Sequence, residues 1–215
     1  MIKGIIFDLD GTTIHTLPDL QESLNKALKE YGFPERTYDQ VRLGVGNGYR
    51  KLIDSAVPEE IPEEIKVSLA ERYKQIYSEN YANHSYPYEG MKEVLQQMQE
   101  KGIKLAVNSN KSTENTNRLI TKNFPGINFV AVIGARKDIP LKPDPYTANE
   151  IIEMMGLKKE EVFYVGDSDV DMHTGHNAGL KTVGCLWGFR DRETLEEADA
   201  DYIVAKPEEL LERLK

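Results

Sequence analysis

The chain has 215 residues, 40% of them hydrophobic and 29% charged, and its 27 basic and 36 acidic residues give a formal net charge of −9. This acidic balance argues against a nucleic-acid partner or an anionic membrane surface, because phosphate-rich partners select basic surfaces. The single cysteine, Cys185, excludes an intramolecular disulfide and fits a cytoplasmic location. We find neither a signal-peptide layout nor an apolar run of the roughly 18 residues that span a membrane.

The first predicted element is a strand that ends in two carboxylates. Residues 5–7 (Ile-Ile-Phe) form an apolar run, typical of a strand buried on both faces, and lead into Asp8, Leu9, Asp10 and Gly11. Residues two apart on a strand point the same way, so Asp8 and Asp10 can converge beyond its end. Two such carboxylates repel each other unless a cation or a proton lies between them. Taken alone, the stretch also fits an ordinary strand followed by an Asp-Gly turn.

Residues 17 to about 82 are predicted to be entirely helical. Apolar side chains recur at helical spacing, and prolines interrupt the pattern. The expected helices cover about 17–28, 39–43, 49–57 and 64–81. We therefore predict an inserted all-helical domain at residues 16–83, within an α/β domain formed by residues 1–15 and 84–215.

A glycine-rich loop interrupts the helices of this insert. Gly46, Asn47 and Gly48 allow close approach of the backbone to a ligand, and the helix that follows offers free N–H groups to an anion. Arg50 lies just beyond the loop. The segment is predicted to be a substrate loop; the alternative is a helix–helix turn with solvated basic neighbours.

From Pro87 onward, helices and strands alternate, which predicts a Rossmann-like, doubly wound parallel sheet. The expected helices are 89–101, 112–122, 146–155, a short helix ending at 177, and 207–214. The expected strands are 103–107, 129–133, 162–165, 182–186 and 202–204.

Polar residues follow the strands of this part. Ser109 and Asn110 offer a hydroxyl and a backbone N–H for phosphoryl oxygens, and Lys142 precedes a stiffening proline. Asp167 and Asp171, four residues apart, would face one side if a helix begins there. Carboxyl ends of parallel strands share one edge of a sheet, where ligands bind. Four carboxylates with one lysine need a divalent cation, and an all-oxygen ligand set favours Mg²⁺.

Four motifs in this order make the chain resemble the haloacid dehalogenase (HAD) superfamily of phosphohydrolases, with a helical cap of the C1 type as the insert. The motifs are residues 8–12 (Asp-Leu-Asp-Gly-Thr), 109–111 (Ser-Asn-Lys), 142–145 (Lys-Pro-Asp-Pro) and 166–171 (Gly-Asp-Ser-Asp-Val-Asp). The resemblance covers the whole chain and is greatest to the phosphoglycolate phosphatase-like subgroup. Three features indicate the subgroup: the cap loop 46–48, the run 141–145 (Leu-Lys-Pro-Asp-Pro), and residues 186–188 (Leu-Trp-Gly) together with 198–203 (Ala-Asp-Ala-Asp-Tyr-Ile).

The resemblance implies a role for each catalytic residue. Asp8 would be the nucleophile, forming an aspartyl-phosphate, and Asp10 the general acid–base. Lys142 would offset the negative charge shared by nucleophile and phosphoryl group.

The resemblance also implies the binding residues. Mg²⁺ would be held by a carboxyl oxygen of Asp8, the backbone carbonyl of Asp10 and the carboxylate of Asp167, with Asp171 as a further ligand or close behind. Ser109 and the backbone N–H groups of Leu9 and Asn110 would hold phosphoryl oxygens. The cap loop, Gly46, Asn47, Gly48 and Arg50, would face the substrate.

His15 departs from the pattern, since relatives commonly carry an acidic residue there. This difference weakens the inference that the chain acts on the same substrate as those relatives. We expect a small phosphorylated metabolite as partner and a monomer or homodimer as the assembly. Three alternatives stay open: a pyrophosphatase or β-phosphoglucomutase-like phosphotransferase on the same scaffold, and a regulatory binding module. Dehalogenation is disfavoured, because it needs no metal and would leave Asp167 and Asp171 unexplained.

Overall fold

The computed structural model describes residues 1–214, and the chain divides into two compact units. One unit comprises Met1–His15 with Pro87–Lys215, and the other comprises Thr16–Tyr86. The second boundary thus lies at residues 86 and 87, where the sequence placed it at 83 and 84. The two-residue strands β2 (Ile14–His15) and β3 (Tyr86–Pro87) pair with each other where the chain passes between the units.

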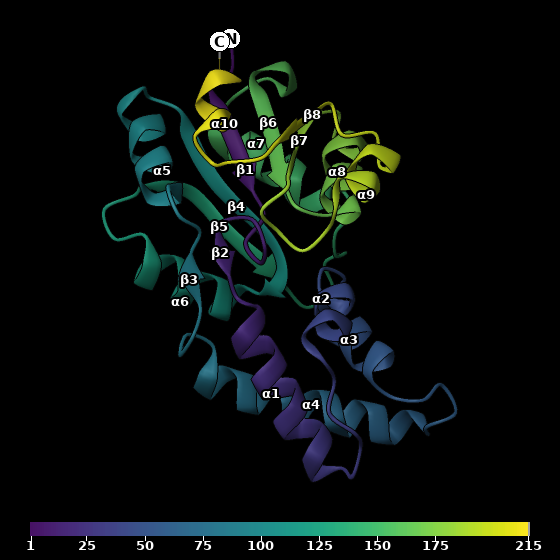
Figure 1. Cartoon of the computed structure of the whole chain (residues 1–215). Helices are drawn as coiled ribbons and strands as arrows, with labels where there is room; N and C mark the ends of the chain where they lie inside the picture. The colour runs from purple at the N-terminus through teal and green to yellow at the C-terminus, as the bar shows by residue number, and fades with distance from the viewer. Residues whose placement is uncertain (215) are drawn as a thin grey trace. The chain divides into compact units, whose positions relative to one another are not determined.

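A six-stranded sheet forms the centre of the first unit, with the strand order β5-β4-β1-β6-β7-β8 (Figure 1). All neighbouring strands are parallel, which confirms the predicted α/β fold with a doubly wound sheet. The strands are β1 (Gly4–Phe7), β4 (Lys104–Ser112), β5 (Phe129–Ala135), β6 (Val162–Gly166), β7 (Lys181–Cys185) and β8 (Tyr202–Val204).

Both faces of the central strand β1 are covered, because the consecutive residues Ile5, Ile6 and Phe7 are all buried. On one face Ile6 and Tyr164 pack with helix α7, through Ile151 and its neighbours. The helices of this unit are α5 (Met91–Glu100), α6 (Thr113–Asn123), α7 (Tyr146–Met155), α8 (Asp169–Asn177), α9 (Arg192–Glu197) and α10 (Glu209–Glu212), with a 3₁₀ turn at Lys159–Glu161. Of these, α9 was not predicted.

The second unit consists of helices α1 (Leu17–Glu30), α2 (Tyr38–Gly44), α3 (Gly48–Ala56) and α4 (Glu63–Asn80). The buried side chains of Leu20, Leu24 and Leu28 form one stripe of α1, which packs against α4 and α2. Thr37 caps α2 in a capping box with Gln40. Across residues 1–214, every helix is too short or too polar to cross a lipid bilayer.

Candidate active site

Neighbouring strands bring three carboxylates together at the carboxyl edge of the sheet. Phe7 of β1 pairs with Val165 of β6, so Asp8 and Asp167 leave the sheet side by side. Asp171 follows in the first turn of α8. All three side chains are buried, and each offers an oxygen within 4.8 Å of the others. The structure therefore brings together residues that lie more than 150 positions apart in the chain.

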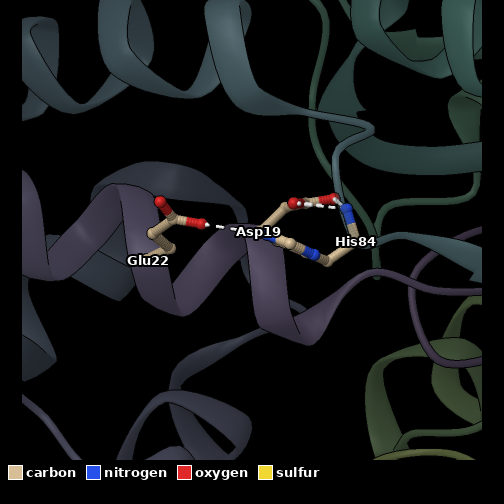
Figure 2. A group of neighbouring side chains, drawn as sticks. All are labelled: Asp19, Glu22 and His84. Atoms are coloured by element: carbon tan, nitrogen blue, oxygen red, sulfur yellow. Dashed lines mark hydrogen bonds and ion pairs between the residues drawn. The ribbon is translucent and has the colours of Figure 1, made fainter.

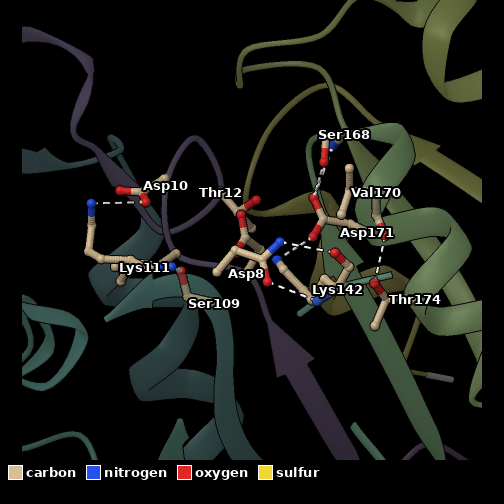
Figure 3. A network of polar contacts seen from close by, with 12 residues as sticks. Asp8, Asp10, Thr12, Ser109, Lys111, Lys142, Ser168, Val170, Asp171 and Thr174 are labelled. Carbon is tan, nitrogen blue, oxygen red and sulfur yellow. Dashed lines mark hydrogen bonds and ion pairs between the residues drawn. The ribbon is translucent and has the colours of Figure 1, made fainter. Parts of the chain in front are cut away.

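Lys142 lies between two of these carboxylates (Figure 3). Its Nζ is 2.6 Å from Asp8 Oδ1 and 2.7 Å from Asp171 Oδ1. The side chain of Asn110 fixes the lysine's backbone: Oδ1 accepts from Lys142 N at 2.9 Å, and Nδ2 donates to Lys142 O at 3.1 Å. Within the described residues, Asp8 Oδ2 accepts no hydrogen bond, which leaves that oxygen available for chemistry.

Burial and crowding perturb the protonation of this group. Burial raises the pKa of Asp8 well above its usual value, although the Lys142 charge opposes the shift. Burial and the neighbouring Asp171 raise the pKa of Asp167 to about 7. Burial would lower the pKa of Lys142, but Asp171 and Asp8 hold it well above the usual range. The lysine is therefore a permanent cation among carboxylates that a proton or a metal ion must share.

A capping box positions Asp171. Ser168 is the N-cap of α8, and Asp171 Oδ2 accepts hydrogen bonds from the Ser168 backbone N at 3.1 Å and from its hydroxyl at 2.6 Å. Since α8 begins at Asp169, Asp167 lies before the helix rather than on its face. Asp167 and Asp171 lie close together because Asp167 follows the end of β6 and Asp171 folds back onto the N-cap Ser168. Their proximity therefore does not come from the helical spacing that the sequence predicted.

Asp167 is held by residues that the sequence analysis did not assign. Oδ1 accepts from the Thr12 hydroxyl at 3.0 Å, and Oδ2 accepts from the backbone N–H of Phe189 at 2.7 Å. A Cβ at Gly188 would lie 2.2 Å from the Asp167 Cβ, so only glycine fits between this segment and the carboxylate. The Ser-x-x-Asp signal could have revealed Ser168, whereas the contact with Phe189 had no local sequence signal.

Asp10 lies apart from the three-carboxylate group and pairs with Lys111, whose Nζ is 3.1 Å from Asp10 Oδ2. Ser109 Oγ accepts the backbone N–H of Lys111 at 3.2 Å (Figure 3). The Leu9 carbonyl accepts N–H groups from Thr12 and two following residues, which forms the turn that carries Asp10. These residues therefore lie around the end of β1, next to Asn110, whose side chain holds the backbone of Lys142.

The predicted substrate loop belongs to the helical unit. Gly46 has φ 121°, Asn47 is the N-cap of α3, and Gly48 has φ 81°, so both glycines adopt conformations that other residues rarely accept. Arg50 Nε pairs with Asp54 Oδ1 at 3.1 Å and its Nη2 with Glu63 Oε2 at 2.7 Å. A role for these four residues in binding substrate stays a prediction.

The buried group fits a hard divalent cation. Three carboxylates lie close together, two of them paired with a single lysine, and all the donor atoms are oxygens, which Mg²⁺ prefers. Lys142 supplies one positive charge, which cannot balance three ionised carboxylates. Because burial disfavours the remaining negative charge, the pKa values of Asp8 and Asp167 are raised. By fold and site, the protein belongs to the α/β proteins that place an acidic centre, with carboxylates close enough to hold a metal ion, at the carboxyl edge of a parallel sheet.

Comparison with known proteins identifies the family. A family model described as haloacid dehalogenase-like hydrolase matches residues 5–185. The chain is 32% identical over 211 residues to a phosphoglycolate phosphatase of Aquifex aeolicus, covering 98% of this chain and 95% of that protein. It is 33% identical to one of Haemophilus influenzae, covering 94% and 93%. The chain belongs to the haloacid dehalogenase-like hydrolases, as the four motifs indicated.

Solved structures agree with this assignment. A structure from Lactobacillus delbrueckii subsp. bulgaricus superposes with a TM-score of 0.93 at 28% identity, covering 99% of this chain and 98% of that one. A second, from Haemophilus somnus and described as a predicted phosphoglycolate phosphatase, has a TM-score of 0.90 at 30% identity, covering 100% and 98%. The similarity therefore extends over both units of the chain.

Proposed function

We propose that this protein is a Mg²⁺-dependent phosphatase that hydrolyses a small phosphate monoester through an aspartyl-phosphate, with phosphoglycolate as the first candidate substrate. The observation that carries the proposal is the buried group of Asp8, Asp167 and Asp171, in which Lys142 pairs with Asp8 and Asp171. The names of the full-length relatives from Aquifex aeolicus and Haemophilus influenzae support the substrate. A small phosphorylated metabolite is the proposed partner, and the cytoplasm is the proposed location.

Asp8 is the proposed nucleophile. Lys142 binds Oδ1 at 2.6 Å, which orients the carboxylate and leaves Oδ2 to attack phosphorus. The P–O bond to the leaving group breaks as the bond to Asp8 forms, and water then releases phosphate and restores the carboxylate. Lys142 stays protonated throughout, so it balances charge that accumulates on the transferred group.

Asp10 is the proposed general acid–base. Its position two residues after the proposed nucleophile, at the turn that follows β1, supports this role. The ion pair with Lys111 at 3.1 Å holds this carboxylate away from the buried group. Asp10 would protonate the leaving oxygen and then take a proton from the attacking water.

Asp8 and Asp167, with the backbone carbonyl of Asp10, are the proposed Mg²⁺ ligands. Both oxygens of Asp171 are engaged by Lys142 and Ser168, so this residue orients the lysine and adds charge close behind the ligands. The bound cation would supply charge neutralisation between the phosphoryl group and the carboxylates. The Ser109 hydroxyl and the N–H groups of Leu9 and Asn110 are the proposed phosphoryl contacts.

Phosphate release from a panel of small phosphates tests the proposal. The panel contains phosphoglycolate, pyrophosphate, several sugar phosphates and an aryl phosphate, each with and without Mg²⁺. We expect phosphoglycolate to give the highest kcat/KM, Mg²⁺ to be required, and Asp8→Asn to abolish turnover. Asp169→Asn is the matched control, because its exposed carboxylate lies near the buried group but outside it.

The other outcomes separate the alternatives. A preference for pyrophosphate or a sugar phosphate would change the assigned substrate but not the proposed mechanism. Isomerisation of a sugar phosphate without net phosphate release identifies a phosphotransferase. Metal binding without turnover of any compound identifies a binding module and contradicts the proposal.

A further inference from the structure

The segment that joins β7 to α9 contacts the buried acidic group from outside the four motifs. Phe189 donates its backbone N–H to Asp167 Oδ2 at 2.7 Å. Trp187 Nε1 donates to the backbone carbonyl of Thr12 at 2.9 Å, and the Thr12 hydroxyl in turn donates to Asp167 Oδ1 at 3.0 Å. The positions of both carboxylate oxygens of Asp167 therefore depend on where residues 187–189 lie.

Close packing leaves this segment no freedom toward the carboxylate. A Cβ at Gly188 would lie 2.5 Å from Asp167 Oδ2 and 2.5 Å from the Gly11 carbonyl oxygen. A Cβ at Gly11 would lie 2.3 Å from Asp167 Oδ2. Backbone on two sides thus encloses the carboxylate, and a displacement of either segment moves Asp167.

Aromatic side chains hold residues 187–189 in place. The Phe189 ring, 3% exposed, meets the His15 ring edge to face with centroids 6.0 Å apart. His15 also meets Tyr88 at 5.6 Å, and its Nδ1 is 3.1 Å from the Tyr88 hydroxyl. Tyr88 lies 6.5 Å from Trp187, centroid to centroid. These four residues, His15, Tyr88, Trp187 and Phe189, form an aromatic cluster within the α/β unit.

The cluster lies where the chain leaves the α/β unit and where it returns to it. His15 is the last residue of the α/β unit before the helical unit, and Tyr88 is the second residue after the chain returns. The backbone N–H of Tyr88 also bonds the Thr13 carbonyl at 3.4 Å. The residues at the crossings and those that orient Asp167 therefore share one packed group.

We propose that Trp187 and Phe189 are positioning residues for the metal ligand Asp167, and that the aromatic cluster with His15 and Tyr88 sets the affinity of the site for Mg²⁺. This inference rests on the proposed function, since Asp167 is taken there as a ligand. The cluster itself touches no reacting atom. It acts through the Phe189 N–H and the Thr12 hydroxyl, because hydrogen bonds to a ligating carboxylate orient it and control its affinity for the metal.

Calorimetric titration of the full-length protein with Mg²⁺ alone tests this inference. Phe189→Leu keeps the backbone N–H and most of the apolar volume but removes the ring contact with His15. Trp187→Phe keeps an aromatic ring but removes the bond to Thr12. We expect each to weaken Mg²⁺ binding by up to about 10-fold, the lower end of the effect of losing a direct partner of a metal ligand, because each variant displaces the partners of Asp167 without removing them.

Phe124→Leu is the matched control, because Phe124 is also 3% exposed and meets Phe129 edge to face at 6.4 Å in the same unit. Its Mg²⁺ affinity should stay within about twofold of the parent's, as expected for a residue outside the metal's surroundings. Tyr88→Phe, the mildest variant, removes only the hydroxyl next to His15 and should weaken binding measurably. It keeps the test decisive if a larger change prevents folding.

The outcomes separate this inference from the proposed function. Wild-type binding of Mg²⁺ that Asp167→Asn removes supports the metal site, whatever the cluster variants do. Wild-type affinity in Phe189→Leu, Trp187→Phe and Tyr88→Phe overturns the positioning role while leaving the metal site intact. An equal loss in Phe124→Leu overturns it too, because any core substitution would then suffice. Absence of Mg²⁺ binding in the wild type overturns both.

Discussion

Two groups of acidic and histidine side chains in residues 1–214 are close enough to hold a metal ion, and they differ in how their carboxylates are satisfied. Asp8, Asp167 and Asp171 are all buried, and Lys142 pairs with Asp8 and Asp171 (Figure 3). Asp19, Glu22 and His84 belong to the helical unit (Figure 2), and only Asp19 is buried. The second group shows how a similar composition serves a structural purpose.

Asp19 already has its partners. Its carboxylate accepts the backbone N–H groups of His84 and Ser85, at 2.9 and 2.8 Å, and the Ser85 hydroxyl at 2.5 Å. Glu22 and His84 are 38% and 62% exposed, and Glu22 also pairs with Lys26. Asp19 therefore ties the segment after α4 to the start of α1. The comparison teaches that the burial of three carboxylates together, two of them sharing one lysine, distinguishes the candidate catalytic group from a structural group of similar residue types.

The largest expected effect comes from Lys142→Met. This change leaves Asp8 and Asp171 without their shared cation, so we expect kcat/KM to fall by about a hundredfold to a thousandfold. The metal-free protein should also lose about 3–5 kcal/mol of unfolding free energy near pH 8, because breaking a buried ion pair strands its partner. Phosphate release and urea unfolding measure the two effects. Lys181→Met is the control, because Lys181 is an exposed lysine in the same unit. If Lys142→Met kept an activity within tenfold of wild type, the charge-balancing role of Lys142 would be contradicted.

The next effect concerns stability alone. Asp19→Ala leaves two backbone N–H groups and a hydroxyl without their acceptor, so we expect a loss of about 2–4 kcal/mol in unfolding free energy. The Mg²⁺ affinity should not change, since the α/β unit supplies every proposed ligand. Urea unfolding and Mg²⁺ titration measure these quantities. Weakened Mg²⁺ binding in Asp19→Ala would break the distinction between the two groups.

A third prediction concerns pH. The folded-state pKa of Asp167 is raised to about 7, so between about pH 4 and pH 7 the native state holds a proton that the unfolded state releases. The unfolding free energy of the metal-free protein should therefore fall as pH rises through this window, and Asp8 acts in the same direction. Mg²⁺ at a hundred times its Kd should restore about 2.7 kcal/mol above pH 7 and less below, because protons compete for the ligand.

Thermal unfolding at several pH values, with and without Mg²⁺, checks this sign. Asp167→Asn cannot titrate, so its stability should depend less on pH and should not respond to Mg²⁺. A metal-free wild type whose stability rises steadily from about pH 5 to pH 8 would contradict the assignment of a raised pKa to Asp167.

The smallest expected effect is that of Glu22→Gln. Its carboxylate pairs with Lys26 at 2.6 Å and His84 at 3.6 Å on the surface, and exposed pairs of this kind contribute about 0–1 kcal/mol. Unfolding free energy and Mg²⁺ affinity should both stay near the wild-type values. A loss of unfolding free energy as large as that of Asp19→Ala would show that Asp19, Glu22 and His84 stabilise the helical unit jointly, and it would contradict the surface role of Glu22.

Sequence reasoning reached the fold and the proximity of the site residues because both depend on strong local patterns. The apolar run at 5–7 and the alternation of helices and strands fix a parallel sheet, and parallel strands deliver Asp8 and Asp167 to one edge. Helix α7 (Tyr146–Met155) matches its predicted span. The roles given to these residues rest on the family resemblance and stay proposals until the assays above are made.

What sequence reasoning missed depends on contacts distant in the chain or on short elements. Helix α9 has six residues, too few for a clear apolar period, and begins at an Asp191 cap that resembles a turn. The bond from Phe189 to Asp167 joins backbone to side chain across 22 positions, and no residue type encodes it. The ion pairs of Arg50 with Asp54 and Glu63 also went unforeseen, since a basic residue beside a glycine loop reads equally as a ligand contact.

Trapping the covalent intermediate tests the central claim most directly. Asp10→Asn, which slows the water step, is mixed with Mg²⁺ and an aryl phosphate, whose leaving group departs without protonation by Asp10, quenched in acid, and examined by peptide mass spectrometry. We predict one phosphoryl group on the peptide that contains Asp8, and none when Asp8→Asn is added. Phosphate release by the wild type together with a peptide unmodified at Asp8, or modified at another residue, would contradict the account of Asp8 as the nucleophile.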